Sequence, residues 1–302
     1  MALVSIPDRL NAALVLVDSA ALAVALAWGA RAESIGHLAA AVLVFALLFQ
    51  TNFALLHEAA HRKLHSRPGW NSLLGLICGT WFGMSYSMFA ITHLAHHLKN
   101  RTDEEMFDLY YPNDSRLKKG LVWYGMLVGL WYWTIPPANL LLLCFPGAYR
   151  RLAERWSITD SLFREPPATL ARIRIELLGI SAALVAVALA LGLSPACLLL
   201  FYGAAGFLWS TTQYLEHAYA PRDVVNGAFN LRAPAFYSWL NLHRELDLNH
   251  HRWPGEPWLH LPRLSPPGER CRSYILHYLR QWRGPRRALE RGPPPLGRED
   301  LM

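Results

Sequence analysis

The apolar positions of this chain are gathered into four long runs instead of alternating with polar positions. The runs cover residues 11–30, 36–56, 176–193 and 195–215, and Asp18 is the only charge within the first run. A helix of about 20 apolar residues is long enough to cross the hydrocarbon core of a bilayer. Short connections join the first run to the second and the third to the fourth. The pattern therefore predicts an all-α integral membrane protein with four transmembrane helices in two hairpins.

Two further apolar segments, residues 70–89 and 120–145, do not fit single crossings. One crossing by the later segment would place the last histidines of the chain on the other side of the membrane. Pro136 and Pro137 also break a helix near the middle of that segment. The Gly, Ser, Trp and Tyr content of the earlier segment is typical of helices that lie at the level of the lipid headgroups. We therefore expect re-entrant or interfacial helices in both places.

The composition agrees with a membrane protein, because 53% of the residues are hydrophobic and only 17% are charged. The first run lacks the basic start and the cleavage site of a signal peptide, so we expect it to be retained. No cysteine pair has Cys-x-x-Cys spacing, and we expect four free thiols. The cysteines are Cys78, Cys144, Cys197 and Cys271.

Lysine and arginine are distributed unevenly among the connecting segments. Only Arg31 lies between the first two runs, and the turn between the last two contains no basic residue. By the positive-inside rule the other segments are cytosolic, in the inner or plasma membrane if the source is bacterial. We attribute the net charge of +7 to this topology and to anionic lipid headgroups, not to nucleic-acid binding. A cationic face would also attract an acidic electron-donor protein.

Eight of the thirteen histidines fall in four places, each at the predicted cytosolic end of an apolar segment. They are His57 and His61; His93, His96 and His97; His217; and His250 and His251. Residues four positions apart share one face of a helix, so the first pair can bind one metal ion. Ionisable side chains at membrane depth are costly and need a common partner. The pattern therefore predicts a metal centre in a histidine-rich cytosolic cap.

The type of ligand narrows the choice of metal. Imidazole and carboxylate without thiolate suit iron or zinc. Zinc takes about four ligands, whereas eight histidines and Asp247 exceed one tetrahedral site. Two ions with five or six ligands each match this number. Two iron ions can together store the electrons that are needed to activate O2.

These motifs resemble the membrane fatty acid desaturase superfamily, which also contains alkyl hydroxylases and carotenoid ketolases. The resemblance covers about residues 45–262 and rests on three stretches. They are His57-Glu-Ala-Ala-His61, His93-Leu-Ala-His-His97 followed by Asn-Arg-Thr, and His250-His-Arg-Trp-Pro-Gly-Glu-Pro-Trp258. The last stretch is similar to the His-His-x-x-Pro-x-x-Pro-Trp ending of the family.

The resemblance implies a set of ligands for each iron. One iron would be held by His57, His61, His93, His97 and His251. The other would be held by His96, His217, His250 and Asp247. Gln213 would hold a metal-bound water. The family usually has histidine at the position of Asp247, so this chain departs from the pattern there. His243, one turn earlier, could replace the missing ligand or orient Asp247, and we expect the second role.

The resemblance also implies an oxidoreductase with a non-haem di-iron centre that uses O2 to desaturate a lipid acyl chain. Hydroxylation of an alkyl chain or ketolation of a carotenoid at the same centre remain alternatives. The chain has no fused haem or iron–sulfur domain. We therefore expect a separate ferredoxin-, rubredoxin- or cytochrome b5-like electron donor.

Other interpretations of the same residues remain open. His57-Glu58-Ala-Ala-His61 also matches the His-Glu-x-x-His pattern of zinc proteases, although such a protease leaves the other histidine groups unexplained. A metal-storage or haem-binding protein could also gather histidines. The acids Asp103, Glu104, Glu105 and Asp108 are interpreted as a solvated helix face. We expect one membrane desaturase-like domain over residues 1–282 and a disordered basic tail over residues 283–302.

Overall fold

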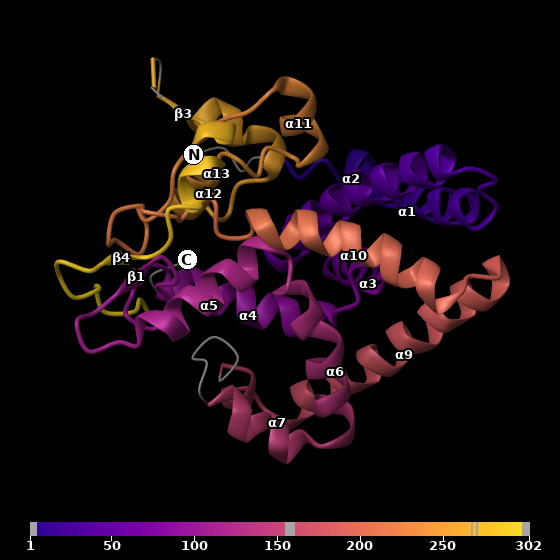
Figure 1. The fold of residues 1–302 in the computed structure, drawn as a ribbon, viewed down its shortest axis with the longest axis horizontal. Helices are drawn as coiled ribbons and strands as arrows, with labels where there is room; N and C mark the ends of the chain where they lie inside the picture. Colours follow the sequence, from indigo (N-terminus) through magenta and orange to yellow (C-terminus); the bar gives the residue numbers. More distant parts are fainter. Residues whose placement is uncertain (1–4, 155–160, 267, 270, 298–302) are drawn as a thin grey trace.

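The computed structural model describes residues 5–154, 161–266, 268–269 and 271–297, and it is mostly helical (Figure 1). Within this part of the chain, four helices are long and apolar enough to cross a membrane. They are α1 (Asp8–Ala30), α2 (Ile35–Ala60), α9 (Pro167–Leu191) and α10 (Pro195–Thr212). The predicted all-α fold with two hairpins is confirmed. Helix α9 begins earlier than the apolar run alone indicated.

Helix α2 lies at the centre of the bundle and packs against α1, α3 and α10. In the most apolar 18-residue stretch of α2, 61% of the residues are buried, whereas in the corresponding stretch of α9 only 17% are buried. Helix α9 diverges from α10 towards the outside of the bundle (Figure 1). Its exposed apolar side chains, such as Ile175 and Leu189, are suited to contact with lipid.

Both segments that were expected not to cross the membrane directly form sharply bent helix pairs. Helices α3 (Pro68–Phe82) and α4 (Tyr86–Lys99) meet at 92°. Helix α5 (Arg116–Leu127) meets the segment formed by η1 (Tyr132–Thr134) and α6 (Ile135–Cys144) at 101°. A bend of this size is compatible with the re-entrant or interfacial hairpins that the sequence predicts.

The second bend lies at a glycine and not at the two prolines. Gly129 has φ +90°, and a Cβ atom there would lie 2.9 Å from the Cα of Phe207 on α10. Pro136 and Pro137 occupy the first turn of α6, where a missing N–H leaves no hydrogen bond unmade. The expected break near the prolines is therefore corrected to the residues that precede η1.

Short elements form a cap over one end of the bundle, where α2, α4 and α10 end (Figure 1). They include α11 (Ala235–Leu240), α12 (Asp247–Arg252), η3 (Trp258–Leu264) and α13 (Tyr274–Gln281). Helix α7 (Pro146–Ala153) lies apart from this cap and packs against α6 (Figure 1), and η2 (Ser161–Arg164) packs against α4. Two parallel pairs link distant parts of the chain. They are β1 (Leu109–Tyr110) with β4 (Arg286–Arg287), and β2 (Leu231–Arg232) with β3 (Arg272–Ser273).

The segment after residue 282 has defined contacts as far as residue 297. Strand β4 pairs with β1, the Gly292 amide donates to Asp103 Oδ1 at 2.8 Å, and the Leu296 amide donates to the Leu98 carbonyl at 2.9 Å. These backbone contacts hold a segment that has no apolar periodicity, which is why the sequence pattern indicated disorder. The predicted domain boundary at residue 282 stays a prediction. Residues 298–302 lie outside the described part of the chain.

Candidate metal centre

All eight histidines predicted as ligands are brought together at the capped end of the bundle. His57 lies in the last turn of α2, and His61 follows that helix directly. Helix α4 carries His93, His96 and His97, His217 follows α10, and α12 carries Asp247, His250 and His251. Four separate stretches of sequence therefore contribute to one site.

The first histidine group contains His57, His61, His93 and His250, whose ligand nitrogens all lie within 4.8 Å of one another. The Nε2 atom of His93 lies 2.7 Å from His61 Nε2 and 3.1 Å from His97 Nε2. The Nε2 atom of His97 lies 3.0 Å from His250 Nε2. In a neutral imidazole, each ring nitrogen has either one proton to donate or one lone pair to accept with. It therefore cannot form good hydrogen bonds to two other ring nitrogens at once.

A shared metal ion would account for this crowding. Metal–imidazole bonds are about 2.0–2.1 Å long, so two ligands at a right angle lie about 3 Å apart. The Nε2 distances around His93 and His97 agree with this spacing. The residues of the first group, with His97 added, therefore fit one metal ion.

The second histidine group contains His96, His217 and His251, whose ligand nitrogens also lie within 4.8 Å of one another. Asp247 Oδ2 lies 3.2 Å from His217 Nε2 and 3.5 Å from His251 Nε2. Asp247 Oδ2 and His251 Nε2 are buried, yet neither has a hydrogen-bond partner among the residues that the structure describes. Buried polar atoms are normally paired. Their arrangement fits a cation bound by three imidazoles and one carboxylate.

The two groups are adjacent, with the ring centres of His97 and His251 4.3 Å apart. The resemblance placed His251 with the first iron and His250 with the second, whereas the structure groups them the other way round. Successive residues of a helix point in directions about 100° apart. The rotation of α12 about its axis therefore decides this partition, and sequence spacing does not reveal that rotation.

Burial keeps the imidazoles of the centre in the form that binds metal. Burial, with a smaller contribution from neighbouring imidazoles, holds the pKa of His217, His250 and His251 well below its usual range. These rings are therefore neutral, with a lone pair available for a metal. Burial raises the pKa of Asp247, although His96 and Arg244 oppose that shift. A bound cation would keep this carboxylate ionised.

Glu105 is buried beside the candidate ligand His96, although the sequence interpretation assigned it to a solvated surface. It is 3% exposed, and His96 Nδ1 donates to its Oε1 at 2.5 Å. Nδ1 of His217 is held similarly by the Gly227 carbonyl at 3.0 Å. A partner on Nδ1 fixes the ring and leaves Nε2 for the metal. The only sequence signal for Glu105 was its place in the run of acids after the second histidine motif.

Asp108 is also buried, which corrects its assignment to a solvated face. It forms an ion pair with Arg101 at 2.5 Å, and the exposed fractions of the two side chains are 0% and 1%. Asp108 Oδ2 accepts from the Tyr219 amide at 2.6 Å, and Arg101 donates to the Tyr214 hydroxyl at 2.9 Å. These bonds fasten the loop after α4 to the segment that carries His217. The acids Asp103 and Glu104 do have exposed side chains.

Two predicted accessory residues have different surroundings. The buried Gln213 Oε1 has no hydrogen-bond partner within the described part of the chain, and its predicted role in holding a metal-bound water stays a prediction. His243 stacks against Trp258, with ring centres 5.9 Å apart, and its Nδ1 lies 3.7 Å from Glu245. Among the described residues, no hydrogen bond or ion pair joins His243 to Asp247. The prediction that His243 orients Asp247 is therefore not supported by a polar contact between the two described side chains.

Glu58 has a structural partner that differs from the role of a protease base. Its Oε2 accepts a hydrogen bond from the Trp258 amide at 3.1 Å, and the residue is 4% exposed. The carboxylate thereby links the end of α2 to the start of η3. A zinc protease would also leave the second histidine group without a role. Both observations speak against that alternative.

Comparison with known proteins agrees with this site. The sequence model of the family described as fatty acid desaturase matches residues 34–282, which include every ligand candidate. A curated relative, "Beta-carotene 4-ketolase 3" of Haematococcus lacustris, is 30% identical over 251 residues. The match covers 78% of this chain and 65% of the length of the ketolase.

Proposed function

The chain belongs to the fatty acid desaturase family, and from that premise we propose that it uses a pair of iron ions and O2 to oxidise C–H bonds of a membrane lipid. It is an oxidoreductase of the desaturase superfamily. The observation that supports this function best is the convergence of the two adjacent histidine groups. Our first candidate reaction is desaturation of an acyl chain.

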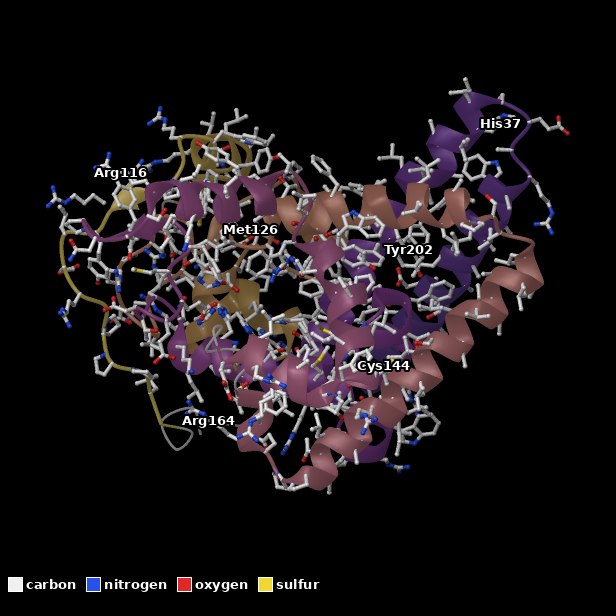
Figure 2. All side chains as sticks on the ribbon, turned by 60° about the horizontal axis from the view of Figure 1, so that its bottom comes forward. His37, Arg116, Met126, Cys144, Arg164 and Tyr202 are labelled. Atoms are coloured by element: carbon white, nitrogen blue, oxygen red, sulfur yellow. The ribbon has the colours of Figure 1, made fainter. Side chains whose placement is uncertain are left out.

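A cavity between membrane-spanning helices supports an apolar substrate. It has a volume of about 410 Å³, lies among α1, α6, α9 and α10, and is lined mainly by aliphatic side chains. Tyr202, labelled on α10 in Figure 2, and Asn139 are among the few polar lining residues. An alkyl or isoprenoid chain matches such a lining, because its burial gains the hydrophobic free energy that a polar substrate would lose.

A series of aromatic rings runs from this cavity to the first histidine group. Tyr132 lines the cavity and contacts Phe82, with ring centres 5.8 Å apart. Phe82 contacts Phe53 at 5.2 Å, Phe53 contacts Phe89 at 5.6 Å, and Phe89 stacks on His93 at 5.5 Å. In the proposed enzyme, these packed rings exclude water from the region between the cavity and the metal centre.

The division of roles follows from these positions. When bound, the iron pair with O2 supplies the oxidising power for an unactivated C–H bond. The eight histidines and Asp247 would hold the metals, while Glu105 fixes the ring of His96. The apolar wall would hold one carbon of the substrate near the centre. Whether a second hydrogen is removed or oxygen is transferred depends on small differences in that position.

Two further parts of the proposal concern the surroundings of the enzyme. The distribution of lysine and arginine supports a cytosolic position for the metal centre. The electrons would come from a separate donor protein. Asp247 would make the second iron more electron-rich than the histidine usual in the family.

The match to a β-carotene ketolase favours a second candidate, the ketolation of a carotenoid. β-Carotene is long and wholly apolar, and it therefore matches the mainly aliphatic lining of the cavity. The same metal centre could serve either reaction.

Product analysis distinguishes the candidates. The protein is produced in a host that makes both acyl lipids and β-carotene, and total lipids are compared by mass spectrometry with those of a His97→Ala strain. Loss of two hydrogens from acyl chains supports desaturation. Replacement of two hydrogens of the carotenoid by one oxygen supports ketolation. Identical lipids in both strains, with stable protein in each, would overturn the proposed function.

A further inference from the structure

Arginines of the C-terminal segment cluster above the second histidine group. We name this surface the arginine face and define it by Arg280, Arg283, Arg286 and Arg287. The Cζ atoms of Arg286 and Arg280 lie 4.1 and 5.6 Å from the centre of the Tyr219 ring. Tyr219 follows His217 by two residues in the chain. The arginine face is thus separated from a candidate metal ligand by one aromatic side chain and a short piece of backbone.

The contacts beneath the arginine face hold it in place. Strand β4, which contains Arg286 and Arg287, pairs with β1. The Tyr219 hydroxyl donates to the Gly284 carbonyl at 2.8 Å, and Trp123 Nε1 donates to the Gln281 carbonyl at 2.9 Å. The arginines are therefore carried by a segment that is bonded to the core of the cap.

Packed rings fill the space between the arginine face and His217. The ring centres of Tyr219 and Trp123 are 6.1 Å apart, those of Trp123 and Tyr214 are also 6.1 Å apart, and those of Tyr214 and His217 are 5.4 Å apart. Trp123 is fully buried and Tyr214 is 4% exposed. Electron tunnelling weakens steeply with distance and across solvent gaps. A short, dry path of this kind favours electron transfer from this surface.

The charge of the arginine face is not neutralised within the chain. Within the described residues, no ion pair joins any of its four arginines to a carboxylate. Residues 272–291 contain six arginines and one acid, Glu290. Arg116, labelled in Figure 2, adds a further positive charge above Tyr110 of β1, with its Cζ 5.2 Å from the ring centre. Such a surface attracts a partner of opposite charge.

The uncharged neighbours of these arginines resemble a protein interface. Tyr124 and Trp282 are 39% and 41% exposed, and their rings lie 6.5 Å apart beside the arginines. Arginine, tyrosine and tryptophan are the residues that most often dominate the binding energy of protein interfaces. Exposed apolar residues of α13, such as Leu276 and Leu279, could also meet an anionic lipid surface. The short path to His217 favours the protein.

We propose that the arginine face docks an acidic one-electron redox protein, which delivers electrons to the metal centre beside Tyr219. This inference rests on the proposed function. Each of two donor molecules is oxidised by one electron, and each ferric ion is reduced by one electron. No covalent bond forms or breaks in this step. The rings of Tyr219, Trp123 and Tyr214 remain closed-shell and act only as the medium for tunnelling.

Binding to the metal-free protein tests the docking directly. The full chain is placed in nanodiscs of neutral lipid, and the probe is an acidic plant-type [2Fe–2S] ferredoxin. We expect Arg286→Glu combined with Arg287→Glu to raise the Kd at least about tenfold at low salt, because two attractions become repulsions. The difference should shrink at high salt, since ions screen surface charges. The matched control, Arg150→Glu with Arg151→Glu on the distant helix α7, should leave the Kd unchanged (Figure 1).

Reduction of the iron-loaded protein provides a second measurement. Ferredoxin-driven reduction should be slowed about as much as binding is weakened, whereas reduction by dithionite should match the wild type. Failure of the wild type to bind ferredoxin, or equal binding by the wild type and the Arg286–Arg287 variant, would overturn the proposal. So would a variant that loses only its affinity for anionic vesicles, which would assign the face to lipid. Because docking is measured without metal, it does not depend on which product the enzyme forms.

Discussion

The hydrogen bond between Glu105 and His96 gives the sharpest prediction about the metal centre. The substitution Glu105→Gln keeps the size of the side chain but removes its charge. His96 Nδ1 lies 2.5 Å from Glu105 Oε1, and the exposed fractions of the two side chains are 17% and 4%. The bond is therefore largely shielded from water, and its loss should cost more than that of a surface pair.

The expected magnitude follows from this geometry. A hydrogen bond to a charged group contributes about 1.5–3 kcal/mol. Since 1.4 kcal/mol corresponds to about a tenfold change in an equilibrium constant, the affinity of the second histidine group for metal should fall about 10- to 100-fold. Loss of a residue that orients a metal ligand has a similar effect in other metalloproteins. The first histidine group contains no ligand held by Glu105 and should keep its affinity.

The assay is a metal titration in competition with a chelator, followed by the ligand-field spectrum of bound Co²⁺. Glu104→Gln is the matched control, because the neighbouring Glu104 side chain is 47% exposed and pairs with Lys99. The control should bind both metals as the wild type does. If Glu105→Gln also binds both metals with wild-type affinity, the role assigned to Glu105 is refuted.

Three further predictions concern other parts of the molecule. Asp247→Ala should lose the metal of the second histidine group while His243→Ala keeps both metals, as measured by metal content after gel filtration; the opposite result would exchange their roles. The metal-free protein should lose thermal stability as the pH falls below about 6.5. Burial lowers the pKa of His217, His250 and His251 in the folded protein, so the unfolded chain binds more protons in this range and is favoured. A Tm that rises on acidification would contradict this. Gly129→Ala should lower the unfolding free energy by more than about 1 kcal/mol, because φ is +90° there and the added Cβ would approach the α10 backbone to 2.9 Å; an unchanged Tm would show that the bend adapts.

The sequence was sufficient for features that depend on periodicity and residue type. The lengths of the apolar runs predicted the two hairpins, because the thickness of a bilayer fixes the length of a span. The spacing of His57 and His61 placed both rings at the end of one helix, and both lie in the first histidine group. These features are local, so short stretches of sequence contain the information.

Features that depend on how distant segments meet could not be obtained in this way. The partition of His250 and His251 depends on the rotation of α12 against α4 and the turn after α10. Glu105 resembles a surface acid in sequence, and only the fold of its loop brings it to His96. The bend after α5 arises from a positive φ at Gly129 and its close approach to α10, whereas the sequence drew attention to Pro136 and Pro137.

The central claim is that two adjacent histidine groups bind a pair of iron ions. The most direct test is a metal count and a Mössbauer spectrum of the full chain purified from cells supplied with enriched iron. We predict a pair of coupled, high-spin, non-haem iron ions in each chain. A single zinc ion, a haem spectrum, or iron ions without magnetic coupling would contradict the claim.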